Sequence, residues 1–346
     1  MKRKIEFIEW LRVISAIAVI GIHVTITLPN NSSIEIIGMY NYIALTGVYT
    51  SLQWAVAVFL MISGYLHLQS DVTIKKVVKM MLRMGKVLIV FGTLYAILEQ
   101  VFSLKSFKIQ MVPVAFLMTL EQRSWSHLWY LYVMIGIYLI LIPLKKFVVS
   151  ATKEEMRFMV GILLIGNFVI PTINVAVGTK LETYMIFSEY VTYFIVGYVI
   201  EKSEENKYLD EYGSVKLGYI FAAATLTKVM IQIVYVLKYG EGSPIVLNDR
   251  ILSFVQAISI FYIVRQCLRE KCLGRVAKSI SECSFGIYLI HPLFINLLYK
   301  GLNVNPISIF HGNVWIGIVI IWSAVFLCSW FTIWTVKKLK VIGDII

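Results

Sequence analysis

The chain has 346 residues, of which 59% are hydrophobic and only 15% are charged, and its mean hydropathy is +0.78. A soluble domain is closer to half apolar and a quarter charged, so this composition excludes an ordinary soluble protein and indicates a polytopic membrane protein. The formal net charge of +12 would suggest a nucleic-acid partner in a soluble protein. The four cysteines are too few and too scattered for a disulfide framework, and they lack the His and Cys pairs of a metal site, so we expect no metal.

Apolar runs long enough to span a bilayer occur about ten times along the chain. We expect spanning helices at 5–28, 48–68, 84–103, 127–147, 157–176, 187–201, 215–238, 250–268, 280–299 and 313–336. The sixth run is short, and the apolar segment 107–120 has the length of a re-entrant or interfacial helix. The first run is interrupted by charges and no small-residue cleavage site follows it, so we interpret it as an uncleaved anchor. The predicted fold is an all-α bundle forming a single integral-membrane domain, 1–346.

The basic residues gather on one side of this topology. If the ten helices cross in turn, about three quarters of the 32 Lys and Arg residues fall at the N-terminus, in alternate connections and in the C-terminal tail. Cytoplasmic segments carry such an excess, so both termini are predicted to be cytoplasmic. Topology then explains the net charge, and no nucleic-acid partner is needed. The largest inner connection, 202–214, is predicted to be a charged solvated loop, and the largest outer connections are 29–47 and 104–126.

The first predicted helix carries two ionisable residues, Arg12 and His23. Eleven steps along an α-helix make about three turns and rise about 16 Å, so both residues lie on one face, with Arg12 toward the cytoplasm. Charge within a spanning segment is costly and marks a candidate functional site. The alternative is that Arg12 extends to the headgroups and His23 is a satisfied polar residue of the bundle.

Further polar residues follow on the second and third helices. Ser63 and Gly64 permit close helix contact or a local break in the second helix. Arg83 and Lys86 share a face at the inner end of the third helix, where they could hold one polyphosphate or serve as ordinary positive-inside flanks.

The outer half of the bundle is predicted to hold the titratable groups. Glu99 ends the third helix, His127 begins the fourth beside a Trp-Tyr pair, and His291 lies past mid-membrane on the ninth, next to a proline. Lys228, on the seventh helix, is expected to extend outward to the membrane surface.

Cations at the inner end and proton-transfer groups in the outer half suit an anionic cytoplasmic donor whose reactive end must reach an acceptor on the far side. Coenzyme A is such a donor, because a phosphorylated nucleotide carries a long flexible arm that ends in a thioester. The rise of about 16 Å from Arg12 to His23 is of the order of an extended pantetheine arm.

Several stretches, in this order and spacing, resemble the membrane acyltransferase-3 family and its O-acetyltransferase branch, which modifies bacterial surface glycans. They are Glu9-Trp-Leu-Arg12 through His23, Val58 to Tyr65, Ser126 to Tyr132 running to Pro143, Tyr193 to Tyr198, and Ser284 to His291. The resemblance covers nearly the whole chain. Two residues depart from the family pattern. Glu9 stands where Asp is common, and Lys86 stands where a second Arg is usual, which keeps the charge but loses bidentate phosphate geometry.

The resemblance implies about ten helices in the bacterial plasma membrane. It also implies acetyl-CoA, or another acyl-CoA, as cytoplasmic co-substrate and a hydroxyl of a cell-surface or lipid-linked glycan as acceptor. In this reading His23 is the essential histidine, and Arg12 with the basic motif Arg83 and Lys86 holds the CoA end. Ser63, in a matching stretch, joins the candidate CoA-binding residues.

The mechanism we expect has His23 as general base on the acceptor hydroxyl, with Glu99 and His127 as candidates to orient its ring if the first, third and fourth helices are neighbours. A transient acyl-histidine is the variant. Three other classes stay open at this point. They are a transporter or flippase for a glycan precursor or amino acid, the membrane part of a racemase-like partner enzyme (disfavoured because no soluble domain is attached), and a structural or sensory protein.

Overall fold

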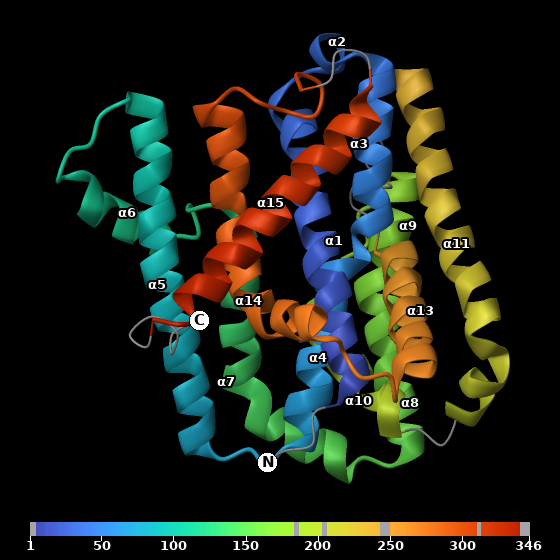
Figure 1. Cartoon of the computed structure of the whole chain (residues 1–346). Helices are drawn as coiled ribbons and strands as arrows, with labels where there is room; N and C mark the ends of the chain where they lie inside the picture. The colour runs from blue at the N-terminus through green and yellow to red at the C-terminus, as the bar shows by residue number, and fades with distance from the viewer. Residues whose placement is uncertain (1–4, 183–186, 203–205, 243–249, 310–312, 340–346) are drawn as a thin grey trace.

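The computed structural model in Figure 1 describes residues 5–182, 187–202, 206–242, 250–309 and 313–339. Within these ranges the regular secondary structure is entirely helical, and nine helical segments are long and apolar enough to cross a bilayer. A shorter apolar helix, α10, occupies the position of the sixth predicted run. The predicted all-α polytopic bundle is therefore confirmed. Both chain ends, at 1–4 and 340–346, lie outside the described residues.

The helices follow the predicted order. They are α1 (Glu6–Asn31), α2 (Ile34–Ile37), α3 (Met39–Leu52), α4 (Trp54–Gln69), α5 (Ile74–Leu104), α6 (Met111–Leu120), α7 (Trp129–Ser150), α8 (Lys153–Leu164), α9 (Ile170–Val177), α10 (Glu189–Lys202), α11 (Asn206–Tyr239), α13 (Ile251–Leu268), α14 (Arg275–Asn296) and α15 (Val314–Val336).

Three connections are shorter than the sequence indicated. The segment 29–47, expected as an outer loop, is largely helical, because α3 has an apolar face that buries Tyr42 and Leu45. Thr73 caps α5 by accepting a hydrogen bond from the backbone N–H of Lys76, so this helix starts ten residues before the predicted boundary. The predicted loop 202–214 lies partly outside the described residues, and in the rest α11 begins at Asn206 and bends at Gly213, whose φ is 70°.

The segment 107–120 contains no helix long enough to cross a membrane. It contains the ten-residue helix α6, which packs against α5 at one edge of the bundle (Figure 1). This length fits the predicted re-entrant or interfacial helix rather than a span.

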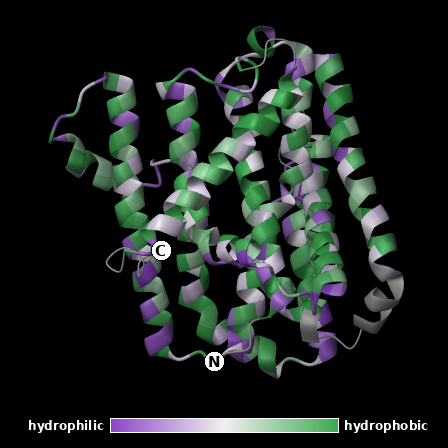
Figure 2. Cartoon of the chain, viewed as in Figure 1, coloured by the Kyte–Doolittle hydropathy of each residue, from purple (hydrophilic) through white to green (hydrophobic). Residues whose placement is uncertain are grey.

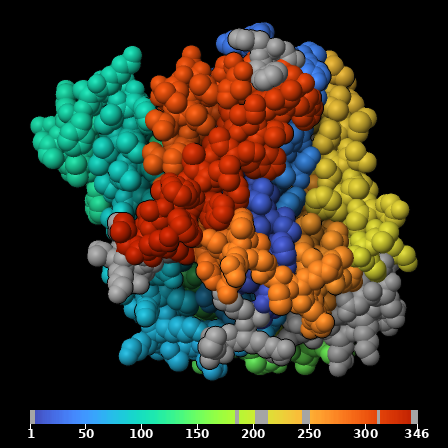
Figure 3. Space-filling model, viewed as in Figure 1, coloured from blue at the N-terminus to red at the C-terminus, as the bar shows by residue number. Residues whose placement is uncertain are grey.

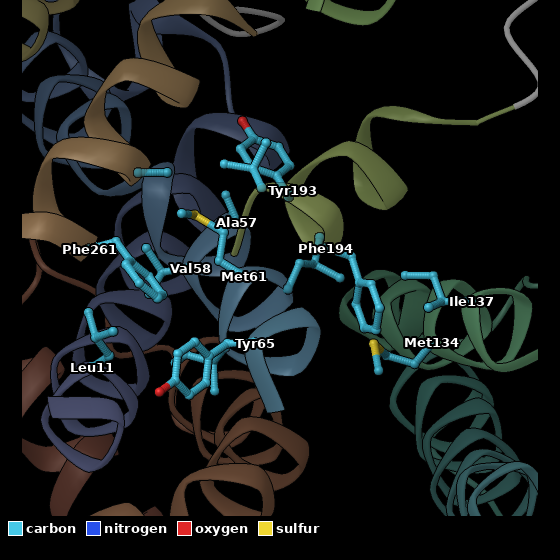
Figure 4. Close-up of a cluster of buried hydrophobic side chains, with 14 of the residues drawn as sticks. Leu11, Ala57, Val58, Met61, Tyr65, Met134, Ile137, Tyr193, Phe194 and Phe261 are labelled. Carbon is cyan, nitrogen blue, oxygen red and sulfur yellow. The ribbon is translucent and has the colours of Figure 1, made fainter. Parts of the chain in front are cut away.

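The centre of the bundle is α4, which packs against α1, α7, α10 and α13 (Figure 4). Backbone meets backbone where α4 and α10 cross. A Cβ on Gly64 would lie 1.7 Å from the carbonyl oxygen of Phe194, and one on Gly197 would lie 2.1 Å from that of Met61. The Ser-Gly pair of the second predicted helix therefore has a packing role, since only glycine allows this approach.

On the face shown in Figures 1 and 3, α15 runs obliquely over α1 and α14. The ring of Trp322 fills the space above Gly21, where an added Cβ would lie 2.4 Å from the indole. The indole N–H donates to the carbonyl oxygen of Ile17 over 2.8 Å. These contacts fix α1 against the rest of the bundle along its middle.

Along most helices hydrophobic residues predominate, and hydrophilic ones are more frequent toward the helix ends (Figure 2). Many large hydrophobic side chains are exposed on the bundle, and several polar side chains are buried inside it. One interior polar residue contradicts the sequence analysis. Lys228 is fully buried and does not extend to the membrane surface. Its Nζ donates to Ser253 Oγ over 2.7 Å and to Gln256 Oε1 over 3.3 Å, so partners on α13 satisfy the ammonium group inside the bundle.

Candidate active site

Three histidines from distant parts of the chain lie together inside the bundle. His23 comes from α1, His127 from the short 3₁₀ helix Ser126–Leu128 before α7, and His291 from α14. The ring centroids of His23 and His291 are 4.9 Å apart, those of His127 and His291 are 5.7 Å apart, and those of His23 and His127 are 6.4 Å apart. In the described part of the chain, no three His, Cys, Asp or Glu side chains are arranged to hold a metal ion.

A backbone carbonyl of α14 fixes the position of His127. The Leu289 oxygen accepts a 2.6 Å hydrogen bond from the Tyr95 hydroxyl and lies 3.3 Å from His127 Nε2. Because a carbonyl can only accept, Nε2 of His127 carries the proton in this contact. The Tyr288 hydroxyl donates to the His127 backbone oxygen. His127 is therefore held by α5 and α14 together and is almost fully buried.

His23 is the member of the cluster that faces open space. It is half-buried and lines a cavity of about 990 Å³. No hydrogen bond joins its ring nitrogens to any of the residues that the structure describes. An unengaged imidazole at the wall of a cavity can take a proton from a bound molecule.

The cavity opens at the end of the bundle where α1 ends. Its wall includes Asn30 and Asn31 from that end of α1, Glu99 from α5, His127, and Lys300 beyond α14. Its opposite wall comes from α3, α4, α10 and α13, and it includes the side chains of Tyr49, Gln53, Glu189, Tyr190, Arg250 and Ser253.

Glu99 lines this cavity together with His23 and His127, but its carboxylate is engaged elsewhere. Lys300 Nζ lies 2.7 and 2.8 Å from its two oxygens, and the indole N–H of Trp125 donates to it over 2.9 Å. The structure thus brings the three predicted catalytic residues to one cavity. It gives Glu99 an ion pair with Lys300 rather than a contact with an imidazole.

Arg12 lies three turns before His23 on α1, outside the cavity wall. Its Nη1 is 2.9 Å from Glu9 Oε1, and Glu9 Oε2 accepts a 2.5 Å hydrogen bond from Ser281 Oγ on α14. The guanidinium is about one-third exposed, so part of its donor fork is accessible.

The remaining predicted CoA-binding residues also lie outside the cavity wall. Ser63 on α4 lies 3.4 Å from the Tyr130 hydroxyl, which interacts electrostatically with Arg12. Arg83 and Lys86 are exposed on α5, where three-residue spacing places them on one face. Tyr130 and Tyr288 pack with their ring centroids 5.5 Å apart and stand between this polar region and the histidines.

Sequence reasoning placed His291 among the titratable groups of the outer half but gave it no catalytic role, and it gave Tyr288 and Tyr130 no role. The signal for His291 was present, because a histidine beside a proline in an apolar helix is a costly residue there. The two tyrosines carried no comparable signal, since Tyr is common near membrane interfaces. Only the ring contact between Tyr130 on α7 and Tyr288 on α14 shows their place.

The arrangement offers an unengaged imidazole at a large cavity, two further histidines beside it, and Arg12 toward the other end of the same helix. Such a constellation suits transfer of a group between two molecules that approach from opposite ends, with proton transfer at His23.

The comparisons with known proteins agree with this chemistry. A family model described as an acyltransferase domain, that of the acyltransferase-3 family, matches residues 5–334, nearly the whole chain. No curated protein and no solved structure gives a match. The chain belongs to the acyltransferase-3 family and is a multi-pass membrane acyltransferase.

Proposed function

We propose that this acyltransferase is an O-acetyltransferase that moves an acetyl group from cytoplasmic acetyl-CoA to a hydroxyl of a cell-surface or lipid-linked glycan. The observation that carries the proposal is the position of His23. It faces the cavity at one end of the bundle, while Arg12 lies about 16 Å along the same helix toward the other end. With the predicted orientation, we assign the acceptor site to the outer side and the cationic end to the inner side of a bacterial plasma membrane.

In the proposed reaction, His23 accepts the proton of the acceptor hydroxyl as its oxygen attacks the thioester carbonyl carbon. The C–S bond breaks, the acyl group becomes an ester of the acceptor, and the thiolate of CoA leaves. The protonated His23 returns the proton to that thiolate. Direct transfer fits a ring whose nitrogens are unengaged, and an acyl-histidine intermediate is the alternative that trapping experiments would detect.

The phosphate groups of CoA are assigned to Arg12, Arg83 and Lys86. Charge-assisted hydrogen bonds to phosphate are strong, and Arg presents them in a bidentate fork. Ser63 lies 3.4 Å from the Tyr130 hydroxyl, and the Tyr130 ring packs against Tyr288, so Ser63 and Tyr130 are assigned to the pantetheine arm.

A transfer assay with radiolabelled acetyl-CoA tests this function. Purified protein in lipid nanodiscs is mixed with glycan acceptors, and ester formation is followed. His23→Ala is expected to reduce transfer by about 100-fold or more, the usual contribution of a general base. His67→Ala is the matched control, because His67 is also a partly buried histidine but lies beside Tyr138, away from the cavity. Full transfer by a folded His23→Ala protein would contradict the proposal.

The match to an acyltransferase family favours the enzyme over the alternative function of a transporter or flippase. Should the polar interior instead serve as a permeation path, labelled sugar would accumulate in proteoliposomes without any ester being formed.

A further inference from the structure

The charged groups of the cavity carry information about the acceptor. Five charged residues line it within the described part of the chain: Glu99, Arg123, Glu189, Arg250 and Lys300. The three cations are each paired with a carboxylate. Lys300 lies 2.7 Å from Glu99, Arg250 lies 2.8 Å from Glu189, and Arg123 lies 3.0 Å from Glu121.

The rest of the wall is rich in neutral polar and aromatic side chains. Four asparagines supply amides. Asn31 already donates to the backbone and the Asn305 oxygen already accepts from it, but each amide keeps its other group for a ligand, as do Asn30 and Asn303. Trp129 and Tyr190 form a ring pair with centroids 4.9 Å apart on the wall formed by α7 and α10. Aromatic surfaces and amides are suited to the C–H faces and hydroxyls of a sugar.

An anionic acceptor would have to compete with Glu99, Glu189 or Glu121 for a cation that already has a partner. A neutral polyhydroxyl molecule needs no such exchange. Resting on the proposed function, we propose that this cavity binds an uncharged saccharide, and that acidic glycans and sugar phosphates are poor acceptors.

The test compares two acceptors that differ only in charge, a galactose trisaccharide and the corresponding galacturonate trisaccharide, in the nanodisc assay with radiolabelled acetyl-CoA. We expect kcat/KM for the neutral trisaccharide to be at least tenfold higher. The variant Glu189→Gln removes the partner of Arg250 and is expected to raise the relative use of the acidic trisaccharide by about fivefold. Glu154→Gln, which makes the same charge change at an exposed position on α8, is the control and should leave the ratio unchanged.

Equal or better use of the acidic trisaccharide by the native protein would overturn the inference while leaving the acetyltransferase function standing. An unchanged ratio in Glu189→Gln would also overturn it. Failure of both sugars to accept acetyl groups, with His23→Ala behaving like the native protein, would instead refute the proposed function itself.

A separate observation concerns His291. Its Nδ1 lies 3.2 Å from the carbonyl oxygen of Ile287, one turn earlier on α14. Because that oxygen can only accept, Nδ1 carries the proton and Nε2 presents a bare lone pair. The ring is fully buried, and Nε2 has no hydrogen-bond partner among the residues that the structure describes. A buried acceptor without a partner is costly, which points to a partner gained at another stage.

The imidazole nearest to His291 is that of His23, with ring centroids 4.9 Å apart. The other titratable groups around it are His127, whose Nε2 is engaged with Leu289, and Tyr288, whose hydroxyl donates to the His127 backbone. We propose that His291 is a positioning residue, whose Nε2 accepts an N–H of His23 and so turns the other ring nitrogen toward the acceptor hydroxyl.

Two variants of similar size and polarity separate this role from simple packing. Gln places an amide oxygen near the position of Nε2, whereas Asn reproduces the Nδ1 donor and has no acceptor near Nε2. We expect His291→Asn to lower kcat by about 100-fold with KM for acetyl-CoA unchanged, and His291→Gln to stay within about tenfold of native. Equal losses in the two variants, a change in KM alone, or failure of both variants to fold would assign His291 a structural role and overturn the proposal.

Discussion

The close contact between α4 and α10 predicts how much stability the protein loses when a glycine at the contact is replaced by alanine. A Cβ on Gly64 would lie 1.7 Å from the Phe194 carbonyl oxygen, and separations below 3.0 Å are essentially never tolerated. Gly64→Ala therefore requires the two helices to part by about 1.3 Å at this point. Overpacking of this kind costs about 1–3 kcal/mol, which exceeds the gain of about 1 kcal/mol from replacing a helical glycine.

The Cβ separations at three glycines rank the stabilities of their alanine variants. Gly197→Ala needs a shift of about 0.9 Å, because its Cβ would lie 2.1 Å from the Met61 oxygen. Gly136→Ala on α7 has nothing within 4 Å and is the matched control. Thermal unfolding in detergent, followed by the loss of the monodisperse peak in size-exclusion chromatography, should give the order Gly136→Ala most stable, then Gly197→Ala, then Gly64→Ala.

The shift also has a functional readout, because Ser63 precedes Gly64 and contacts Tyr130. A displacement of about 1 Å in a substrate-positioning element can lower the rate about 100-fold. A Gly64→Ala protein with the same melting temperature as Gly136→Ala and with native transfer activity would refute this prediction.

Three further predictions concern the cations. Arg12→Lys is expected to raise KM for acetyl-CoA about tenfold, and Arg12→Ala is expected to raise it further, with a smaller change in kcat. The reason is that loss of a charge-assisted phosphate contact weakens binding of the donor. Steady-state kinetics at varied acetyl-CoA concentration measures this effect, and an unchanged KM would contradict it. Lys86→Arg should lower KM for acetyl-CoA by a few-fold through bidentate phosphate contact, and a rise in KM would count against the assignment of this helix face to CoA. Lys228→Met should change the melting temperature little or raise it, because it removes a buried charge; a large loss of stability would show that the bonds to Ser253 and Gln256 outweigh the burial of the ammonium group.

The sequence predicted the architecture well because the bilayer imposes a strong length and hydropathy requirement on each span. It was less accurate at the ends of the spans. Neither the start of α5 at Ile74 nor the helical character of Met39–Leu52 shows in hydropathy, since both depend on a Thr cap or on packing against α1 and α11. For Lys228, hydropathy favoured the surface. Its burial follows from Ser253 and Gln256 on α13, whose register against α11 is not readable from either helix alone.

In the candidate site, too, relations within one helix were predictable from the sequence, whereas relations between helices were not. The position of Arg12 relative to His23 was predictable from the sequence. Both lie on one helix, and helical geometry alone sets their separation of about three turns. The relation of His23 to His127, Glu99 and His291 depends on how four helices cross, and no local pattern carries that. The ion pair of Glu99 with Lys300 shows the consequence, since a carboxylate that looked suited to orient an imidazole is bound to a lysine 201 residues further along the chain.

The layer formed by Tyr130 and Tyr288 bears on how the two ends of the bundle communicate. The cavity at His23 does not reach Arg12 or Ser63, and these two rings stand between the regions. In the proposed reaction the thioester must meet the acceptor hydroxyl beside His23, so the acyl arm has to pass this layer. The Tyr130 hydroxyl is only 3.4 Å from Ser63 Oγ, and its ring is partly exposed, whereas Tyr288 is buried and tied to the His127 backbone. Of the two rings, Tyr130 is therefore the one that could turn aside without breaking a contact that holds His127.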